Sequence, residues 1–456
     1  MISKFSSYLK ENKSSSPLAV FRIGFGLLML YSIIRFWANG WIESIYIVPN
    51  FHFSYFGFEW LPDIGEYIYL IFFLCAISSF FITLGFYYRV SIIIFFLSFT
   101  YIELIDKTTY LNHYYFISIL SFLMIFLPAN AYFSIDNYFK KDQYLEIPRY
   151  FIDSIKFLIS IVYIYAGLAK INSDWLLHAT PLNIWLRSKY DIPIIGSLLQ
   201  DQLVHYIMSW GGMIYDLTIP FLLLYKRTRL LAFFLVIFFH VFTDILFPIG
   251  MFPYIMIFSA IIFFDSKVHN QIILIIKRII KYIALDSIFK KIKIKSKNFK
   301  SSRLKLGIIC TFLFFQLIFP WRYLLYPGEL FWTEQGYRFS WRVMLMDKVG
   351  YTIFTIVDSA SGDSFVVDNS KFLTAFQEKQ MSFQPDFILE YAHYIGDYYK
   401  QKMDYENVQV FADSYVVLNG RRSKVFIDKN VDLYKEKESF KHKDWVLPFN
   451  DEIKGF

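Results

Sequence analysis

The sequence predicts a mainly α polytopic membrane protein, with about nine transmembrane helices and a C-terminal extracytoplasmic α+β domain. Three observations predict this fold class. Of the 456 residues, 56% are hydrophobic and 21% are aromatic, more than a soluble globular protein normally carries. Nine apolar runs come close to the roughly 20 residues that a spanning helix needs. Basic residues gather in alternate connections between those runs.

The nine apolar runs cover residues 17–35, 67–86, 90–105, 115–133, 151–169, 206–225, 229–246, 249–265 and 304–320. The third and eighth runs are short, and the seventh and eighth could form a re-entrant pair. Both cysteines, Cys75 and Cys310, lie inside such runs, so they predict neither a disulfide framework nor a cysteine metal site. We therefore expect a transmembrane domain over 1–320 and a second domain over 321–456.

The charged connections predict the orientation. Lysine and arginine residues precede the first run and follow the second, fourth, sixth and eighth runs; the connection 266–305 alone holds twelve, whereas 36–66 holds none. Because cytoplasmic loops carry the excess of basic residues, the N-terminus is expected in the cytoplasm. The other loops and the C-terminal domain then face the outside, most simply the periplasmic face of a bacterial inner membrane. Residues 270–285 predict a basic helix lying on anionic lipid.

The C-terminal part changes character. Residues 351–367 read as two strands around a Ser-Gly-Asp turn, and 387–403 have helical spacing. Residues 408–428 predict a hairpin with Asn419 and Gly420 at its turn. This pattern indicates a small α+β domain.

Polar residues gather at the predicted outer ends of the helices. The segment DKTTYLNHYY, residues 106–115, places Lys107, Asn112 and His113 beside hydrocarbon, where polar groups are costly unless they pair or act chemically. Lys170 ends another run on the same side, against the trend that places basic residues in the cytoplasm. A lysine at a helix end ordinarily reaches toward the headgroups, so a functional role needs further support.

Lys170 shares one helix face with Tyr163 and Gly167, at positions i, i+4 and i+7. Gly167 would allow another group to approach that face closely. An amine that is shielded from water can act as a neutral base. His113, from the neighbouring helix end, could hydrogen-bond or transfer protons near neutral pH.

Two further polar residues lie inside predicted helices. Asp216 is an intramembrane acid that needs a partner, which the sequence does not identify. His240 is either a packing residue or a functional one. His240 with Asp244, and Glu390 with His393, have metal-ligand spacing, but neither pair has an obvious third ligand, so no metal site is expected. The residues alone predict an outward-facing membrane enzyme or binder with a lysine base, suited to a lipid-soluble molecule such as a quinone.

Several segments resemble the vitamin K-dependent gamma-glutamyl carboxylase family and its bacterial relatives with the HTTM domain. They are DKTTYLNHYY, YAGLAKINSDWL, SWGGMIYDL, FFHVFTDILFPIGMFPYIM and FWTEQGYRFSW, in the order in which the family has them. The stretch VQVFADSYVVLNGRRSKVFID, followed by WVLP, is similar to the family's β-rich region. The resemblance extends over nearly the whole chain, to about residue 450.

The resemblance implies a reaction. A lysine base, matching Lys170, deprotonates reduced vitamin K, whose anion reacts with O2. The strongly basic product removes a γ-proton from a peptide glutamate, the carbanion captures CO2, and the quinone leaves as its 2,3-epoxide. His113 is implied to act beside the glutamate. Implied substrate- or quinone-binding positions are Asn112, Tyr163, Tyr337, Lys107, His240 and Trp332, with Trp341 in support.

The implied co-substrate is reduced vitamin K, phylloquinol or menaquinol, with O2 and CO2. The implied partners are a glutamate-containing peptide and the lipid bilayer, with neither metal nor nucleic acid. Two alternatives stay open: a quinol epoxidase without carboxylation, in which His113 contributes nothing to turnover, and a non-enzymatic scaffold for secreted-peptide maturation. The chain differs from animal relatives in its shorter C-terminal part, in Tyr323 where a histidine is common, and in Ala169 before Lys170 where they have two lysines.

Overall fold

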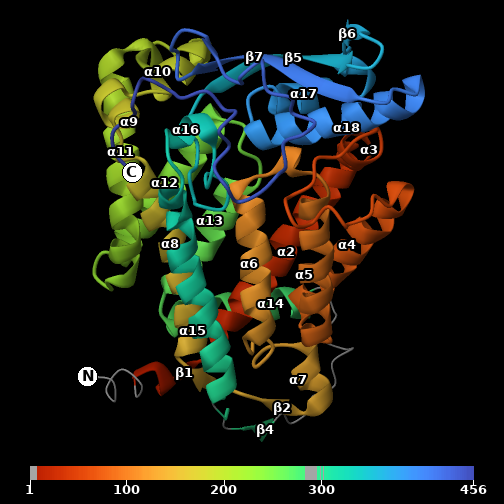
Figure 1. The fold of residues 1–456 in the computed structure, drawn as a ribbon. Helices are drawn as coiled ribbons and strands as arrows, with labels where there is room; N and C mark the ends of the chain where they lie inside the picture. Colours follow the sequence, from red (N-terminus) through yellow and green to blue (C-terminus); the bar gives the residue numbers. More distant parts are fainter. Residues whose placement is uncertain (1–7, 283–294, 298, 301) are drawn as a thin grey trace.

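The computed structural model describes residues 8–282, 295–297, 299–300 and 302–456. The protein is mostly helical (59%). A helix bundle carries at one end a smaller domain built around a four-stranded sheet (Figure 1). Part of the basic connection over residues 266–305 lies outside the described residues.

Seven helices in the described part of the chain are long and apolar enough to cross a membrane. They are α2 (Ser16–Ala38), α4 (Ile68–Leu84, preceded by a 3-10 turn over Gly65–Tyr67), α5 (Tyr88–Ile105), α8 (Tyr150–Ala169), α11 (Gln202–Leu224), α12 (Arg229–Leu246) and α15 (Arg303–Ile318, continued by a 3-10 turn over Phe319–Leu325). Each of them coincides with a predicted run. The mainly helical fold with a strand-containing C-terminal region is thereby confirmed.

The other two predicted runs form shorter helices. α6 (Asn112–Phe126) has 15 residues. α13 (Phe252–Ala260), with a 3-10 turn to Phe263, is followed by α14 (Ser266–Tyr282) at an angle of 118°. If this bent pair counts as one span, the described residues contain eight candidate spans. α14 packs against α2 and covers most of the predicted interfacial helix, whose residues 283–285 lie outside the described part.

The connection between α5 and α6 is shorter than the predicted loop over 106–114. Asp106 caps a single 3-10 turn by accepting hydrogen bonds from the backbone and the hydroxyl of Thr108, at 2.9 and 2.6 Å. α6 then begins at once, so that Asn112 and His113 lie in its first turn rather than in a loop. Their side chains are therefore held by a helix.

α6 also ends before the predicted residue 133. Its last residue is Phe126, because Leu127 precedes Pro128 and a residue before proline avoids the helical conformation. At about 1.5 Å per residue the helix is about 22 Å long, shorter than the roughly 30 Å of a bilayer's hydrocarbon core. The signal that the sequence analysis overlooked is the proline.

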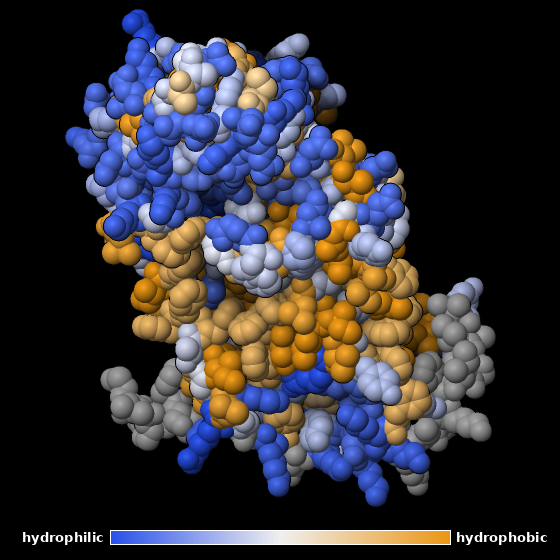
Figure 2. Space-filling model, turned by 45° about the vertical axis from the view of Figure 1, so that its right-hand side comes forward, coloured by the Kyte–Doolittle hydropathy of each residue, from blue (hydrophilic) through white to orange (hydrophobic). Residues whose placement is uncertain are grey.

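Short β-ladders join the connections at the end of the bundle that lies away from the sheet domain. β1 (Asn12–Ser14) pairs with β3 (Glu146–Pro148), and β2 (Asp142–Gln143) pairs with β4 (Lys295–Ser296). α7 (Ile135–Lys140) lies at the same end (Figure 1). On the face that Figure 2 shows, an apolar band crosses the bundle between the hydrophilic sheet domain and a hydrophilic fringe at this end. This distribution is typical of a chain that crosses a bilayer.

A buried arginine ties the bundle together near the β-ladders. Arg22 of α2 is fully buried and donates to the carbonyls of Ile82 and Thr83, at 2.8 and 2.7 Å, which end α4. It also donates to the carbonyls of Ala129 and Phe133, at 3.1 and 2.5 Å. A buried guanidinium is tolerated because its donors are satisfied, and the last carbonyls of a helix attract a cation.

The second domain is an antiparallel sheet with helices packed against it. Its strand order is β6 (Ser364–Val366), β5 (Lys348–Asp358), β7 (Val408–Leu418), β8 (Lys424–Val425), and its helices are α17 (Ala375–Met381) and α18 (Pro385–Met403). The predicted strand pair, helix and hairpin are confirmed. Asn419 and Gly420 both have positive φ, 51° and 71°, as the predicted turn requires.

Short helices lie where this domain meets the bundle: α3 (Trp41–Tyr46), α9 (Ser173–His178), α10 (Leu182–Trp185) and α16 (Leu330–Thr333). Asp174 of α9 accepts two hydrogen bonds from Arg421 and one from Asn419, all at 2.7 Å. Trp185 of α10 donates to Asp347 at 3.0 Å. A bidentate ion pair of this kind, between the buried Asp174 and the half-buried Arg421, fixes the orientation of the domain on the segment that follows α8.

Candidate active site

A first cavity, of about 100 Å³, lies between α8, α11 and α12. Most of its lining is apolar, but Tyr163, Lys170, Asp216 and His240 also line it. The structure thus brings together four polar residues that the sequence placed on three helices. Polar groups in such surroundings need partners, and each of these four has one.

Lys170 pairs with Asp216. Its Nζ lies 2.8 Å from Asp216 Oδ2 and donates to the carbonyl of Ala166 at 3.2 Å. Both side chains are buried, with 7% and 5% of their surface exposed. The lysine also lies over the ring of Trp175, 5.4 Å from its centroid. Lys170 therefore does not extend into solvent, and Asp216 has the partner that the sequence could not identify.

Gly167 permits this pairing. A Cβ atom added to Gly167 would lie 2.7 Å from Leu217 Cγ and 2.9 Å from Leu217 N. The close approach that the glycine predicted is confirmed, and the approaching element is α11. Because Asp216 precedes Leu217, this contact sets its carboxylate against the end of α8.

Tyr163 and His240 form a second pair in the same cavity. The Tyr163 hydroxyl lies 3.0 Å from His240 Nε2. Within the described residues, the buried Nδ1 of His240 has no hydrogen-bond partner. Buried nitrogens of this kind are nearly always satisfied, by protein, water or ligand. The Nδ1 of His240 can therefore form a hydrogen bond with a hydroxyl or carbonyl group of a bound molecule.

A second cavity, of about 840 Å³, adjoins the first. Arg35 of α2, Asn112 and His113 of α6, and Asp244 of α12 line it. His113 is 6% exposed and packs against the ring of Tyr114, with the centroids 4.4 Å apart. The second cavity therefore holds the other predicted catalytic residue, apart from Lys170.

The two cavities share four lining residues, Ile249, Phe252, Val343 and Met344. The ring of Phe252 lies between the two histidines, 5.9 Å from that of His113 and 5.7 Å from that of His240. Lys170 and His113 therefore lie on opposite sides of a thin apolar wall.

Asn112 is the third predicted site residue beside the second cavity. Its Oδ1 accepts from the Tyr110 hydroxyl at 3.1 Å, and its Nδ2 donates to the carbonyl of Arg342 at 3.2 Å. These bonds link the start of α6 to the segment that contains Val343 and Met344. In this structure Asn112 thus holds the wall of the cavity in place.

Lys107 lies apart from both cavities. It is 4% exposed, and its Nζ contacts Asp386 at 3.0 Å and Glu390 at 2.8 Å. Arg338 makes a bidentate pair with the same Asp386, at 2.7 and 3.2 Å. Burial opposes the charged form of Lys107, but the two carboxylates outweigh it and raise the lysine's pKa. This network joins the α5–α6 connection to α18.

Trp332 and Tyr337 also line neither of the two cavities. Trp332 packs in the core of the second domain and donates to the carbonyl of Leu447 at 2.7 Å, and Tyr337 packs against the same core. Trp341 packs against Tyr115 in the bundle, with the ring centroids 5.0 Å apart. The assignment of these residues to a quinone site stays a prediction.

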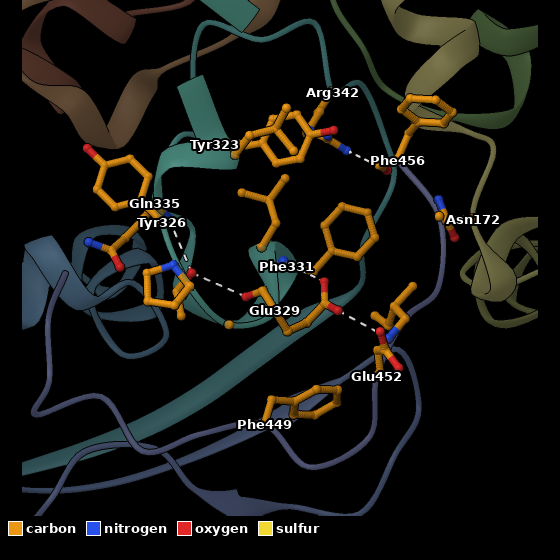
Figure 3. Close-up of a pocket in the computed structure, with 17 residues that line it drawn as sticks. Asn172, Tyr323, Tyr326, Glu329, Phe331, Gln335, Arg342, Phe449, Glu452 and Phe456 are labelled. Carbon is orange, nitrogen blue, oxygen red and sulfur yellow. Dashed lines mark hydrogen bonds between the residues drawn. The ribbon is translucent and has the colours of Figure 1, made fainter. Parts of the chain in front are cut away.

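A third cavity, of about 450 Å³, is lined by Asn172, which follows α8, and by Glu329, Arg342 and Phe456 (Figure 3). The backbone of residues 453–456 runs beside that of 171–173, with hydrogen bonds of 2.9 Å from Phe456 N to Ile171 O and 2.7 Å from Ser173 N to Lys454 O. Arg342 donates to the Phe456 oxygen at 3.0 Å. This segment covers the turn that follows Lys170.

The two pairs with metal-ligand spacing have other partners. Asp244 accepts from the Tyr254 hydroxyl at 2.9 Å, whereas His240 faces Tyr163. Glu390 accepts from Ser54 N at 2.7 Å and pairs with a lysine, and His393 lies against backbone carbonyls. Among the residues that the structure describes, no three His, Cys, Asp or Glu side chains gather as a ligand set.

Comparison with protein families agrees with this architecture. Residues 10–267, more than half of the chain, match the HTTM domain, so the bundle is that of an HTTM-domain protein. Residues 301–452 match the lumenal domain of vitamin K-dependent gamma-carboxylase. The chain therefore belongs to the vitamin K-dependent gamma-glutamyl carboxylase family, as its motifs indicated. A comparison with solved structures finds no significant match.

Sequence reasoning overlooked Arg35, Phe252 and Met344, which line the cavities. Arg35 ends a long apolar helix, a position where arginine usually reaches the membrane surface, so nothing in the sequence set it apart. Phe252 and Met344 resemble many other apolar residues of the chain. Only the fold, which brings α2, α6, α13 and the 343–344 segment to one place, identifies them.

Proposed function

We propose that this protein oxygenates a reduced naphthoquinone to its epoxide and uses that reaction to carboxylate a peptide glutamate. The observation that carries the proposal is the Lys170–Asp216 pair in an apolar cavity beside Tyr163 and His240. Membership of the carboxylase family supports the same reaction. The bound quinol would supply the oxygenation chemistry, and the residues of the chain would position it and accept its proton.

Lys170 is the proposed base. Its proton can rest on either member of the Lys170–Asp216 pair, which stays neutral overall and is therefore tolerated in the apolar cavity. When Asp216 holds the proton, the amine of Lys170 is free to receive one from a quinol hydroxyl. Tyr163 and the unpartnered nitrogen of His240 would bind an oxygen of the quinol and orient it.

The wall between the cavities would have to move. About 100 Å³ is below the roughly 300–1,000 Å³ of pockets that hold small molecules, whereas the second cavity lies within that range. The side chains of Met344 and Phe252, rather than the backbone, separate the two cavities. A methionine side chain adapts its shape readily. Their displacement would join the quinol at Lys170 to a glutamate near His113.

The test is an assay of purified protein in nanodiscs with reduced vitamin K, O2, labelled bicarbonate and a glutamate-containing peptide. We expect both epoxide and incorporated label. Epoxide without label would favour a quinol epoxidase that does not carboxylate. Neither product, from folded protein that binds quinol, would favour a scaffold for peptide maturation and would contradict the proposal.

The proposed orientation places the second domain, the α8 end and both cavities outside the cytoplasm, on the periplasmic side in a bacterium. The positive-inside pattern of the sequence supports it, because the described parts of the basic connections lie at the opposite end of the bundle. The match of residues 301–452 to a lumenal domain agrees. A peptide would reach the site from outside and a quinone from the lipid.

A cysteine at Ser197 tests this orientation, since Ser197 is exposed and its neighbour Leu199 belongs to the same core cluster as the sheet of the second domain. In a Cys310→Ser background, we expect Ser197→Cys to react with an impermeant thiol reagent added to intact cells. The matched control, Lys141→Cys, is exposed at the opposite end and should react only after the membrane is opened. The reverse labelling pattern would show that the orientation is inverted.

A further inference from the structure

Arg35 is a cation on the wall of the second cavity, together with His113 and Asn112. It lies in the last turn of α2, at the end of the bundle that carries the second domain. Tyr114 and Tyr254 line the same cavity. The guanidinium therefore belongs to the cavity rather than to the outer surface alone.

No carboxylate in the described part of the chain lies within 4.0 Å of Arg35. This distinguishes it from Arg338 and Arg421, which pair with Asp386 and Asp174. Asp244, the acid in the same cavity, accepts a hydrogen bond from Tyr254 instead. A guanidinium at the edge of hydrocarbon without an anion is costly, so a ligand that supplies one would bind well.

Trp41 holds Arg35 in position. The guanidinium carbon lies 4.9 Å from the centroid of the Trp41 ring, and this ring packs edge-on against Phe36, with centroids 5.3 Å apart. Stacking on an aromatic ring fixes the plane of the guanidinium and leaves its N–H donors free. Two N–H groups of a guanidinium held in this way can donate hydrogen bonds to the two oxygens of one carboxylate.

We propose that Arg35 binds the side-chain carboxylate of the substrate glutamate in the second cavity, with Trp41 as its positioning residue. The inference rests on the proposed carboxylation and names the group that recognises its peptide substrate. Loss of the γ-proton raises the charge on that side chain from −1 to −2 before CO2 adds. A fixed cation beside the carboxylate would stabilise this added charge. Arg35 would thereby contribute to both specificity and rate.

The test compares binding of two labelled peptides that differ only in Glu or Gln, measured without quinol so that it does not depend on turnover. We expect the wild-type protein to prefer the Glu peptide. Arg35→Gln should weaken Glu-peptide binding about 10-fold or more and abolish the preference, since charged hydrogen bonds contribute more than neutral ones. Arg35→Lys should retain part of it. The control Arg187→Gln, an exposed arginine that lines neither the first nor the second cavity, should keep it in full.

Two results would overturn the inference. One is an Arg35→Gln protein that is folded and still prefers Glu over Gln. The other is recovery of wild-type binding in an Arg35→Gln, Asp244→Asn double variant, which would mean that Arg35 only balances Asp244. A Glu preference that depends on Arg35 in a protein without carboxylation would support the inference while refuting the proposed function.

Discussion

Replacing Lys170 by alanine is expected to lower quinol epoxidation by on the order of 10²–10⁴-fold, the usual contribution of a general base. Among the residues that the structure describes, Lys170 is the only lysine that lines the first cavity, and its amine lies 2.8 Å from Asp216. Lys170→Arg should be as inactive as the alanine variant, because guanidinium does not give up its proton in proteins. The measurement is epoxide formation by purified protein at saturating reduced vitamin K.

The control for this result is Lys156→Ala, which removes a lysine from the N-terminal half of the same helix, α8, that does not line the first cavity. It should retain epoxidation. Asp216→Asn should lower the rate as well, because the amide cannot take up the proton that Lys170 must release. Wild-type epoxidation in a folded Lys170→Ala protein would remove Lys170 from the role of base and with it the proposed mechanism.

The sequence predicted the helices well where apolar runs were uninterrupted, and less well where a proline or a cap decides the boundary. α8 and α12 follow their hydropathy closely, whereas α6 stops at Phe126 because of Pro128 and starts early at Asn112. The mean hydropathy of a window of about 20 residues does not detect a proline or a helix cap. The elements of the second domain could be predicted because the apolar residues alternate along β5 and β7 and recur at helical spacing along α18.

The candidate site could be predicted only in part, because its residues come from different helices. Lys170 and Tyr163 lie on one helix, so their spacing alone placed them together. The partners Asp216 and His240 come from two other helices, and nothing in one sequence gives the register between helices. Gly167 predicted that another element packs closely against α8. That contact is present, but the sequence did not identify Leu217 of α11 as the residue that makes it.

For Lys107 the fold supplies contacts that its chemical type alone did not predict, and its assignment to substrate binding stays a prediction. The sequence placed it beside His113, and the resemblance suggested a role in binding substrate. In the fold its amine turns away from the cavities, toward Asp386 and Glu390. Its effect is therefore expected to be on the attachment of the second domain, and a stability experiment can separate this role from binding.

Replacing Lys107 by methionine is expected to destabilise the folded protein by up to about 3–5 kcal/mol, the usual effect of breaking a fully buried ion pair, because Lys107 is buried whereas Asp386 and Glu390 are partly exposed. Asp386 keeps Arg338, but Glu390 keeps no cation within reach in the described structure. The measurement is thermal or denaturant unfolding in detergent, with limited proteolysis to detect release of the second domain. The control Lys371→Met removes an exposed lysine, 67% of whose side chain is accessible, and should change little.

The effect of Lys107→Met should depend on pH in a direction that the network fixes. Burial already raises the pKa of Glu390, and Lys107 opposes that rise. Without the lysine the pKa of Glu390 should rise further, so the folded variant binds a proton that its unfolded chain has released. Stability falls with pH where the folded state binds more protons, so the variant should lose more stability at pH 8 than at pH 5.

The wild-type protein should behave differently, because Arg338 and Lys107 hold the pKa of Asp386 well below its usual range although burial opposes this. A carboxyl group with a lowered pKa contributes stability that is present above about pH 3.9 and is lost only as the pH falls through its folded value. The raised pKa of Lys107 likewise gives a contribution that is complete below about pH 10.4. Between pH 5 and 8 these two contributions should be constant, so the variant's additional loss of stability over that range reports on Glu390. An equal loss at both pH values would mean that Glu390 does not depend on Lys107.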